Sequence, residues 1–270
     1  MSREETRKIL ESENILPRSR FGQNFLVSDD VISRIIALID ASSDDKVLEI
    51  GPGIGALTKP LSAKYEDLTA VEIDHGLADY LKNEESVSAK IIDSDFLKLA
   101  PSDYSAEDTK CVVSNLPYYC MTPIMKKIFS ECKNAQSLIF MTEDEAFGRI
   151  AAGPNSKDYG PLAVFVSLFG TLTKEFTVSG DCFYPAPRTT SCVITLRRGE
   201  YADTLTPGFI SFVEKCFAMR RKKLMNNLKG SFPAEVLDKV ISDKDIRAED
   251  LTPIRFSRLY SDIISMISDK

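Results

Sequence analysis

Val47-Leu48-Glu49-Ile50-Gly51-Pro52-Gly53-Ile54-Gly55 joins a short, mainly apolar run to a glycine-rich turn. Such a run is typical of a buried parallel strand, and the residues after the turn can begin a helix. Glycines at this point permit a tight turn and close approach of the backbone to a ligand. The spacing is G-x-G-x-G rather than the G-x-G-x-x-G of dinucleotide binders, so the stretch predicts an open α/β sheet with a nucleoside site that lacks a pyrophosphate.

Acidic residues follow the next two predicted strands. Leu68–Ile73 ends in Glu72-Ile73-Asp74, and Glu72 lies about 20 residues after the first glycine, where an acidic side chain binds ribose hydroxyls. Lys90-Ile91-Ile92 leads to Asp95, whose carboxylate can accept a hydrogen bond from an adenine amino group. Each acid alone is more often a solvated loop residue. Their order along the chain predicts S-adenosylmethionine as the cofactor.

A fourth apolar run, Cys111-Val112-Val113, leads into Ser114-Asn115-Leu116-Pro117-Tyr118-Tyr119. This pattern suits methyl transfer to an exocyclic amine of a base, whose nitrogen is a poor nucleophile because its lone pair is delocalised. The Asn115 side-chain oxygen and the Leu116 carbonyl can each accept one N–H bond, while Pro117 stiffens the turn. Tyr118 can lie flat against the base. A strand-end turn with a buried tyrosine is the structural alternative, which the upstream residues disfavour.

Length and composition agree with one soluble enzyme. The chain has 270 residues and is 43% hydrophobic, enough for a sizeable core. No apolar run approaches the roughly 20 residues that span a bilayer, and the N-terminus begins no signal peptide. The six cysteines form no C-x-x-C pair, so we expect no metal site and no disulfide scaffold. We expect a cytoplasmic monomer that does not bind membranes, with the single histidine, His75, as a loop residue rather than a catalyst.

Positive charge is concentrated late in an acidic chain. The net charge is −6 and the pI about 5.1, so a local patch matters more for nucleic-acid binding than the sum. Between Lys215 and Lys229 there are cations and no acids, and Arg220, Arg221, Lys222 and Lys223 are consecutive. A solvated helix face is the structural alternative. Apolar residues in and before this run predict a docked helix, namely Phe212, Val213, Phe217, Leu224 and Leu228.

The order of predicted elements divides the chain into two domains. Strands and helices alternate to about Met141, as in a parallel sheet covered on both faces. Two late strands, Glu175–Val178 and Cys192–Leu196, suit an antiparallel end of the same sheet. Beyond a polar linker we expect only helices, over about 207–218, 220–230, 233–242 and 254–268. We predict a Rossmann-like, S-adenosylmethionine-binding catalytic domain over 1–198 and a small all-helical, RNA-contacting domain over 199–270.

With these residues in place, the sequence resembles the ribosomal RNA adenine dimethyltransferase family of class I methyltransferases. The resemblance extends from about Arg20 to the last helix. It is carried by Phe21-Gly22-Gln23-Asn24-Phe25-Leu26, Glu49-Ile50-Gly51-Pro52-Gly53-Ile54-Gly55, Glu72-Ile73-Asp74, Asp95-Phe96-Leu97, Asn115-Leu116-Pro117-Tyr118, Gly153-Pro154-Asn155-Ser156-Lys157, Phe183-x-Pro185-x-Pro187 and Arg220-Arg221-Lys222. The resemblance implies dimethylation of two adjacent adenosines near the 3′ end of small-subunit rRNA, during ribosome maturation.

The resemblance also implies roles for particular residues. Contacts to S-adenosylmethionine fall on Asn24, Leu26, Gly51, Gly53, Glu72, Asp95 and Asn115. Tyr118 and Phe183 sandwich a flipped adenine, and the helical tail meets rRNA in an immature ribosomal particle. The chain departs from the family pattern at Glu143, where glutamine is common, and at Tyr119-Cys120-Met121.

Two other functions remain open on the residues. One is a large-subunit rRNA adenine methyltransferase of the antibiotic-resistance type, which Leu116 and the C-terminal Arg-Arg-Lys segment modestly disfavour. The other is a non-catalytic RNA-binding assembly factor, against which the intact Asn115, Tyr118 and glycine turn argue. A dehydrogenase is disfavoured by the glycine spacing.

Overall fold

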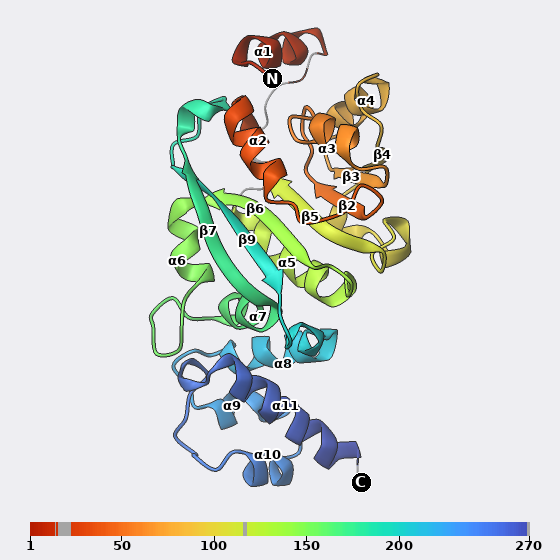
Figure 1. Ribbon diagram of the computed structural model, residues 1–270. Coiled ribbons are helices and arrows are strands. Elements are labelled where there is room, and N and C mark those ends of the chain that lie inside the picture. Colours follow the sequence, from red (N-terminus) through yellow and green to blue (C-terminus); the bar gives the residue numbers. More distant parts are fainter. Residues whose placement is uncertain (14, 16–22, 116–117, 269–270) are drawn as a thin grey trace. The chain divides into compact units, whose positions relative to one another are not determined.

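The computed structural model describes residues 1–13, 15, 23–115 and 118–268 (Figure 1). The chain divides into two compact units. The sheet unit comprises Met1–Phe147 and Leu172–Arg198, and the helical unit comprises Gly148–Thr171 and Gly199–Lys270. The junction after Arg198 coincides with the predicted domain boundary, but residues 148–171, expected in the first domain, group with the second unit.

Contacts inside the helical unit explain this difference. The Tyr159 hydroxyl donates a hydrogen bond to the Leu251 carbonyl at 2.9 Å. The Tyr159 ring also meets Phe217 edge-on, with centroids 5.8 Å apart. A buried tyrosine needs such a partner for its hydroxyl, so the inserted segment packs with the C-terminal helices.

The central sheet has seven strands in the order β4-β3-β2-β5-β6-β9-β7. Their bounds are β2 (Lys46–Ile50), β3 (Leu68–Glu72), β4 (Lys90–Asp93), β5 (Thr109–Asn115), β6 (Ser137–Glu143), β7 (Gly170–Val178) and β9 (Ser191–Arg198). Strands β4 to β6 pair in parallel, and β9 pairs antiparallel to β6. The predicted fold class, a mostly parallel methyltransferase sheet with an antiparallel part, is confirmed.

The strand order reverses beside β2. From β2 the chain builds β3 and β4 on one side and then returns to build β5 and β6 on the other. Ligands of open α/β sheets bind at such a point, beyond the carboxyl ends of the strands. The β2–β5 register pairs Ile50 with Ser114, and the Ser114 hydroxyl donates to the Ile50 carbonyl at 2.5 Å. The register therefore brings Gly51 and Asn115, the next residues, to the same place on the sheet edge.

Helices of the sheet unit follow the apolar periodicity of the sequence. They are α1 (Arg3–Ser12), α2 (Asp29–Ala37), α3 (Thr58–Lys64), α4 (His75–Asn83) and α5 (Tyr118–Glu131), and α6 (Asp144–Ile150) leads out of the unit. The Ser28 side chain caps α2 by accepting from the Val31 amide. Helices α2 and α3 pack in one buried cluster with Val47 of β2 and with Cys111 and Val113 of β5. Cys111 and Val113 are two residues apart, so they lie on the same face of the sheet. No helix of the described residues is long and apolar enough to cross a membrane.

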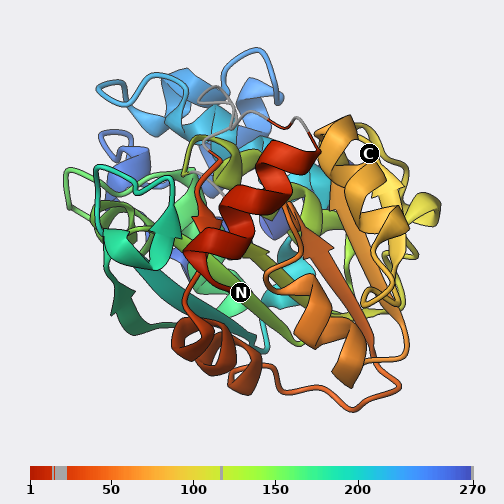
Figure 2. The same ribbon diagram turned by 90° about the horizontal axis from the view of Figure 1, so that it is seen from above.

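A two-stranded ribbon joins the N-terminal segment to the late part of the sheet unit. Strand β1 (Phe25–Leu26) pairs antiparallel with β8 (Phe183–Tyr184). The Arg3 guanidinium of α1 donates to the Asp181 carbonyl at 3.0 Å and to the Phe183 carbonyl at 3.3 Å. Helix α1, red in Figure 2, lies nearest the viewer in that view from above. A small core includes Leu10, Ile15, Phe25, Ile54 and Leu77, so the N-terminal segment is fastened beside the glycine turn.

The helical unit is built around aromatic side chains. Its helices are α7 (Pro161–Phe169), α8 (Pro207–Phe217), α9 (Leu224–Leu228), α10 (Ala234–Val240) and α11 (Pro253–Ser268). Phe209 meets Tyr260 with ring centroids 5.6 Å apart, and Phe217 meets Phe256 at the same distance. Such pairs contribute about 0.5–1.5 kcal/mol beyond the burial of their area.

The predicted helix over 220–230 is wrong in its first half. Helix α8 ends at Phe217 and α9 begins at Leu224, so the four consecutive cations lie in the connecting turn. The Asn227 amide donates to the carbonyls of Cys216 at 2.6 Å and Met219 at 3.2 Å. Carbonyls at a helix end need such partners, and this side chain supplies them, which lets the chain turn here.

Candidate active site

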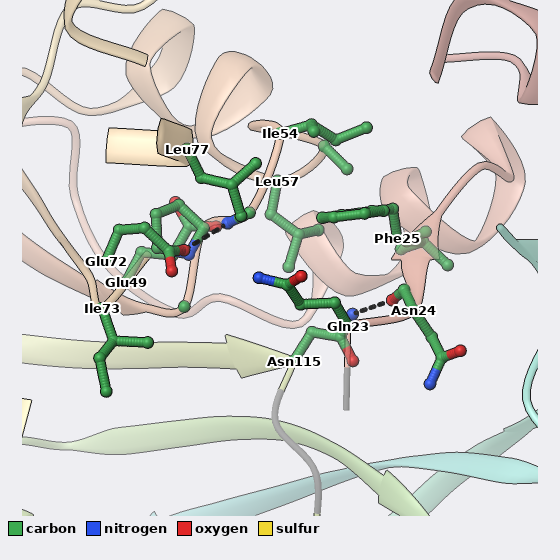
Figure 3. A pocket seen from close by; sticks show the side chains of 15 residues that line it. Gln23, Asn24, Phe25, Glu49, Ile54, Leu57, Glu72, Ile73, Leu77 and Asn115 are labelled. Atoms are coloured by element: carbon green, nitrogen blue, oxygen red, sulfur yellow. Dashed lines mark hydrogen bonds between the residues drawn. The ribbon is translucent and has the colours of Figure 1, made fainter. Parts of the chain in front are cut away.

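A pocket opens at the carboxyl edge of the sheet, where the strand order reverses (Figure 3). It is lined from four places in the chain: residues 23–26, the turn after β2, the end of β3 with the start of α4, and the end of β5. The predicted cofactor residues on its wall are Asn24, Leu26, Gly51, Gly53, Glu72 and Asn115. The topology thus brings together side chains that lie far apart in the sequence.

The glycine turn requires its glycines. Gly51, Gly53 and Gly55 have φ angles of 72°, 60° and 83°, a region that residues with a Cβ atom seldom adopt. A Cβ on Gly53 would also lie 3.1 Å from the Phe25 ring. The turn therefore presents backbone rather than side chain to the pocket, and Phe25 can pack closely against it.

Glu72 ties the end of β3 to this turn. Its carboxylate is buried; Oε2 accepts from the Gly53 amide at 2.9 Å and Oε1 accepts from the Asp74 amide at 2.9 Å. Burial raises the pKa of Glu72, and the two amides act in the opposite direction. Each oxygen retains a lone pair after these bonds, so the carboxylate can also accept from a ligand hydroxyl.

Glu49 is a pocket residue that was missing from the predicted site. It belongs to β2, and its side chain is 2% exposed. Its Oε2 atom has no hydrogen-bond partner among the described residues. Burial raises the pKa of Glu49 to about 8; the Thr58 side chain acts in the opposite direction, and the nearby Glu72 carboxylate adds to the rise. The signal of Glu49 in the sequence is a charged residue inside the apolar run Val47–Ile50, since a buried carboxyl oxygen without a partner is costly unless it serves a ligand.

Asn115 lies on the pocket wall at the end of β5, and its side chain points toward Asn24 (Figure 3). Its Nδ2 atom donates to the Asn24 carbonyl at 3.5 Å, a long hydrogen bond. Gln23 reaches the other side of the pocket, where its Nε2 donates to an Asp74 carboxylate oxygen at 3.3 Å. The segment before β1 is therefore linked to two strand ends across the pocket.

The structure describes little of three residues in the predicted catalytic motif. Leu116 and Pro117 lie outside the described residues, and Tyr118 is described as the first residue of α5 without its side chain. Their roles in binding a base therefore stay predictions from the sequence.

Two predicted site residues do not line the pocket. Asp95 caps the short helical turn Phe96–Lys98, where its Oδ1 accepts from the Leu97 amide at 3.0 Å. Phe183 is 2% exposed and belongs to the core cluster that also contains Leu26, its partner in the ribbon. This placement favours a packing role for Phe183, because its ring offers almost no free face to a base.

His75 is placed away from the pocket wall. It begins α4 and is exposed, with its two ring nitrogens beside the carboxylates of Asp93 and Asp79. The hydrogen bond to Asp93 and the charge of both carboxylates raise the pKa of His75. A histidine paired in this way is a poor general base.

The four consecutive cations of the helical unit divide into two kinds. Arg220 is paired with Glu249 at 3.1 Å and also donates to the Ser156 carbonyl at 2.9 Å. Lys223 is paired with Asp245. Arg221 and Lys222 are exposed and form no ion pair within the described part of the chain. Of the four cations, therefore, only Arg221 and Lys222 are exposed without an ion pair to a described acidic residue.

The fold and the pocket define a class I methyltransferase. The glycine turn after β2, Glu72 at the end of β3 and Asn115 at the end of β5 line one pocket. Solved structures share the fold. A dimethyladenosine transferase from Plasmodium falciparum matches 89% of this chain and 98% of its own, with 22% identity and a TM-score of 0.73. The 23S rRNA methyltransferase ErmE matches 89% of this chain and all of its own, with 24% identity and a TM-score of 0.57.

Comparison with related sequences shows the family to which the chain belongs. The model of the ribosomal RNA adenine dimethylase family matches residues 15–265. Proteins named ribosomal RNA small subunit methyltransferase A are 36% identical over 228 residues in Malacoplasma penetrans, covering 84% of this chain and 83% of the relative, and 35% identical over 269 residues in Clostridium acetobutylicum, covering 96% and 98%. The chain belongs to the ribosomal RNA adenine dimethylase family, which confirms the resemblance seen in the motifs.

Replacing Glu49 with glutamine tests its titration. The pKa of Glu49 is about 8 in the folded protein and 4.5 ordinarily, so across that interval the folded chain holds a proton that the unfolded chain releases. Stability should therefore fall as pH rises through the interval, by up to about 1.4 kcal/mol per pH unit. Glu49→Gln should remove the contribution of Glu49 to this slope and leave that of Glu72, whose pKa is also raised.

Urea unfolding of wild type and Glu49→Gln across this pH interval measures the effect. Glu66→Gln, at an exposed carboxylate of the same unit, is the control and should keep the wild-type slope. Parallel pH profiles for wild type and Glu49→Gln would contradict the raised pKa.

Proposed function

We propose that this chain transfers methyl groups from S-adenosylmethionine to the exocyclic amines of two adjacent adenosines near the 3′ end of small-subunit rRNA. Membership of the adenine dimethylase family supports the reaction, and the names of the relatives support the small-subunit RNA. The observation that carries the proposal is the position of Asn115 beside the glycine-turn pocket, at the strand end where the chain's methyl-transfer motif begins.

The pocket residues fit this cofactor. S-adenosylmethionine is a cationic nucleoside with ribose hydroxyls and an ammonium group, and when bound it supplies a methyl group activated by sulfonium. Glu72 is held by backbone amides with lone pairs to spare for hydroxyls. The unpartnered Glu49 oxygen is suited to a positive group. The glycine turn allows the backbone to approach the ligand closely.

Asn115 is placed to orient the amine that receives the methyl group. Its amide nitrogen donates to the Asn24 carbonyl, which leaves the side-chain oxygen as the accepting end. That oxygen and the Leu116 carbonyl would each accept one N–H bond and direct the nitrogen lone pair at the methyl group. The product nitrogen becomes acidic only after attack, so its proton can leave late to water without a strong base.

The proposal extends to the setting of the reaction. We propose that the enzyme acts as a monomer on an immature ribosomal particle in the cytoplasm, since its substrate is rRNA and its relatives carry small-subunit names. A large-subunit target receives less support, because the likeness to ErmE concerns the fold alone. A non-catalytic assembly factor would not need Asn115 and Glu72 on one pocket wall.

Labelled S-adenosylmethionine tests the substrate directly. The protein is incubated separately with unmethylated small subunits and with large-subunit rRNA, and the label is mapped to nucleotides. Label on two adjacent adenosines near the 3′ end of the small-subunit RNA is expected. Label confined to large-subunit RNA, or no label, would overturn the proposal.

Asn115→Ala should depress turnover far more than cofactor affinity. The variant loses the acceptor that orients the amine, and loss of one oriented polar contact raises a barrier by roughly 2–4 kcal/mol. Single-turnover methylation and calorimetric titration of the cofactor separate the two effects. Near-wild-type turnover would rule out this role for Asn115, as would a rate profile governed by His75.

Glu72→Ala should weaken S-adenosylmethionine binding. Hydrogen bonds to a charged group are worth about 1.5–3 kcal/mol, and here the variant also releases the Gly53 amide. Calorimetric titration measures the affinity, and Glu66→Ala, at an exposed acid of the same unit, is the control. Equal affinities in wild type and Glu72→Ala would place the ribose elsewhere.

The double variant Arg221→Gln/Lys222→Gln should weaken binding to the small subunit. The slope of the logarithm of affinity against the logarithm of salt concentration should become shallower by about 1 for each lost phosphate contact. Lys239→Gln/Lys244→Gln removes two exposed cations from the same unit and is the control. Filter binding across ionic strength compares them, and an unaltered slope in the first variant would place the RNA elsewhere.

Arg220→Gln separates structure from recognition in the same turn. Because Arg220 is bound to Glu249 and Ser156, we expect this variant to lose thermal stability in the helical unit. The thermal stability of Arg221→Gln/Lys222→Gln should equal that of wild type.

A further inference from the structure

Tyr119 is an exposed aromatic residue next to the proposed methyl-transfer site. Its side chain is 63% exposed, the highest value among the large apolar side chains that the structure describes. It is the second residue of α5, four residues after Asn115. Four residues of chain reach at most about 14 Å, so this length bounds the distance between the Cα atoms of Tyr119 and Asn115.

The burial pattern of α5 shows why this ring remains outside the core. Met121, Met125 and Ile128 are fully buried and Ile124 nearly so, which defines the face of α5 that packs in the core of the sheet unit. At 100° per residue, Tyr119 lies on the opposite side of the helix from Met121. Its exposure therefore follows from its place on an otherwise well-anchored helix.

An exposed aromatic ring near the site can replace a stacking partner that the RNA loses in the reaction. An enzyme that modifies a base takes it out of the stack, which leaves the adjacent nucleotide without one of its stacking partners. Aromatic side chains replace base stacking in proteins that bind single-stranded RNA, because every base has a π face. Tyr118 is predicted to serve the target base, and no role in the pocket falls to Tyr119.

We propose that Tyr119 stacks on the nucleotide next to the target adenosine and so holds one adenosine of the pair while the other is methylated. The inference rests on the proposed function, since it takes unpaired adjacent adenosines as the substrate. It assigns Tyr119 to substrate recognition and leaves the cofactor pocket unchanged.

Kinetics on unmethylated small subunits test the ring. Tyr119→Ala should lower kcat/KM roughly 5- to 100-fold, the range expected for loss of one stacked base. Tyr119→Phe should stay within about 3-fold of wild type, because the stacking face is retained. Cofactor affinity and thermal stability should be unchanged in both. Tyr201→Ala removes another exposed tyrosine, in the helical unit, as the matched control.

A fluorescence measurement tests contact independently of activity. The chain has no tryptophan, so Tyr119→Trp introduces a single reporter. Its emission should be quenched when unmethylated small subunits are added, because a base stacks on the indole. Unchanged emission of Tyr119→Trp on this addition would overturn the inference.

The outcomes separate this inference from the proposed function. A wild-type protein that methylates no small-subunit RNA would overturn both. An active wild type with an equally active Tyr119→Ala variant would overturn the role of Tyr119 alone. A loss of activity as large in Tyr119→Phe as in Tyr119→Ala would mean that the hydroxyl, not the stacking face, is needed, and would also overturn it.

Discussion

The carboxylate of Glu72 is the contact on which the pocket depends. It accepts one backbone hydrogen bond from the glycine turn and one from the exit of its own strand. Hydrogen bonds to a charged group contribute about 1.5–3 kcal/mol each, and here they offset part of the cost of burying the acid. Glycines at positive φ give the turn its shape but no side-chain anchor, so this carboxylate holds the turn at the strand ends where Asn115 also lies.

Charge is distributed so that two ligands of opposite kind can be bound. Glu49 and Glu72 place two buried carboxyl groups with raised pKa values beside one cavity. A cation bound there would favour their charged forms, whereas a phosphate would disfavour them. We propose that the RNA contact comes from cations that carry no acidic partner. Arg221 and Lys222 meet that condition in the described structure, whereas Arg220 and Lys223 are bound to acids of their own unit. A net negative chain can therefore bind RNA through a small part of its surface.

The sequence predicted the sheet and most of the pocket because strand ends carry local signals. Apolar runs, glycine spacing and acids at strand exits each depend on a few neighbouring residues, and Gly51, Glu72 and Asn115 were found in this way. The basic segment was predicted as one helix, but Asn227 caps the end of α8 and the chain turns. The burial of Phe183 and the grouping of Tyr159 with the C-terminal helices depend on residues distant in sequence. Glu49 belongs to the glycine-turn motif, but the burial of its side chain and the unpaired Oε2 atom depend on the three-dimensional packing.

The central claim is that the methyl donor occupies the pocket between the glycine turn and Asn115. A crystal structure of the chain with S-adenosylhomocysteine, the demethylated form of the donor, tests this claim most directly. The account predicts ribose hydroxyls within hydrogen-bond distance of Glu72 and the sulfur atom facing Asn115. Density for the nucleoside outside the walls formed by Gly51, Gly53 and Glu72 would contradict it.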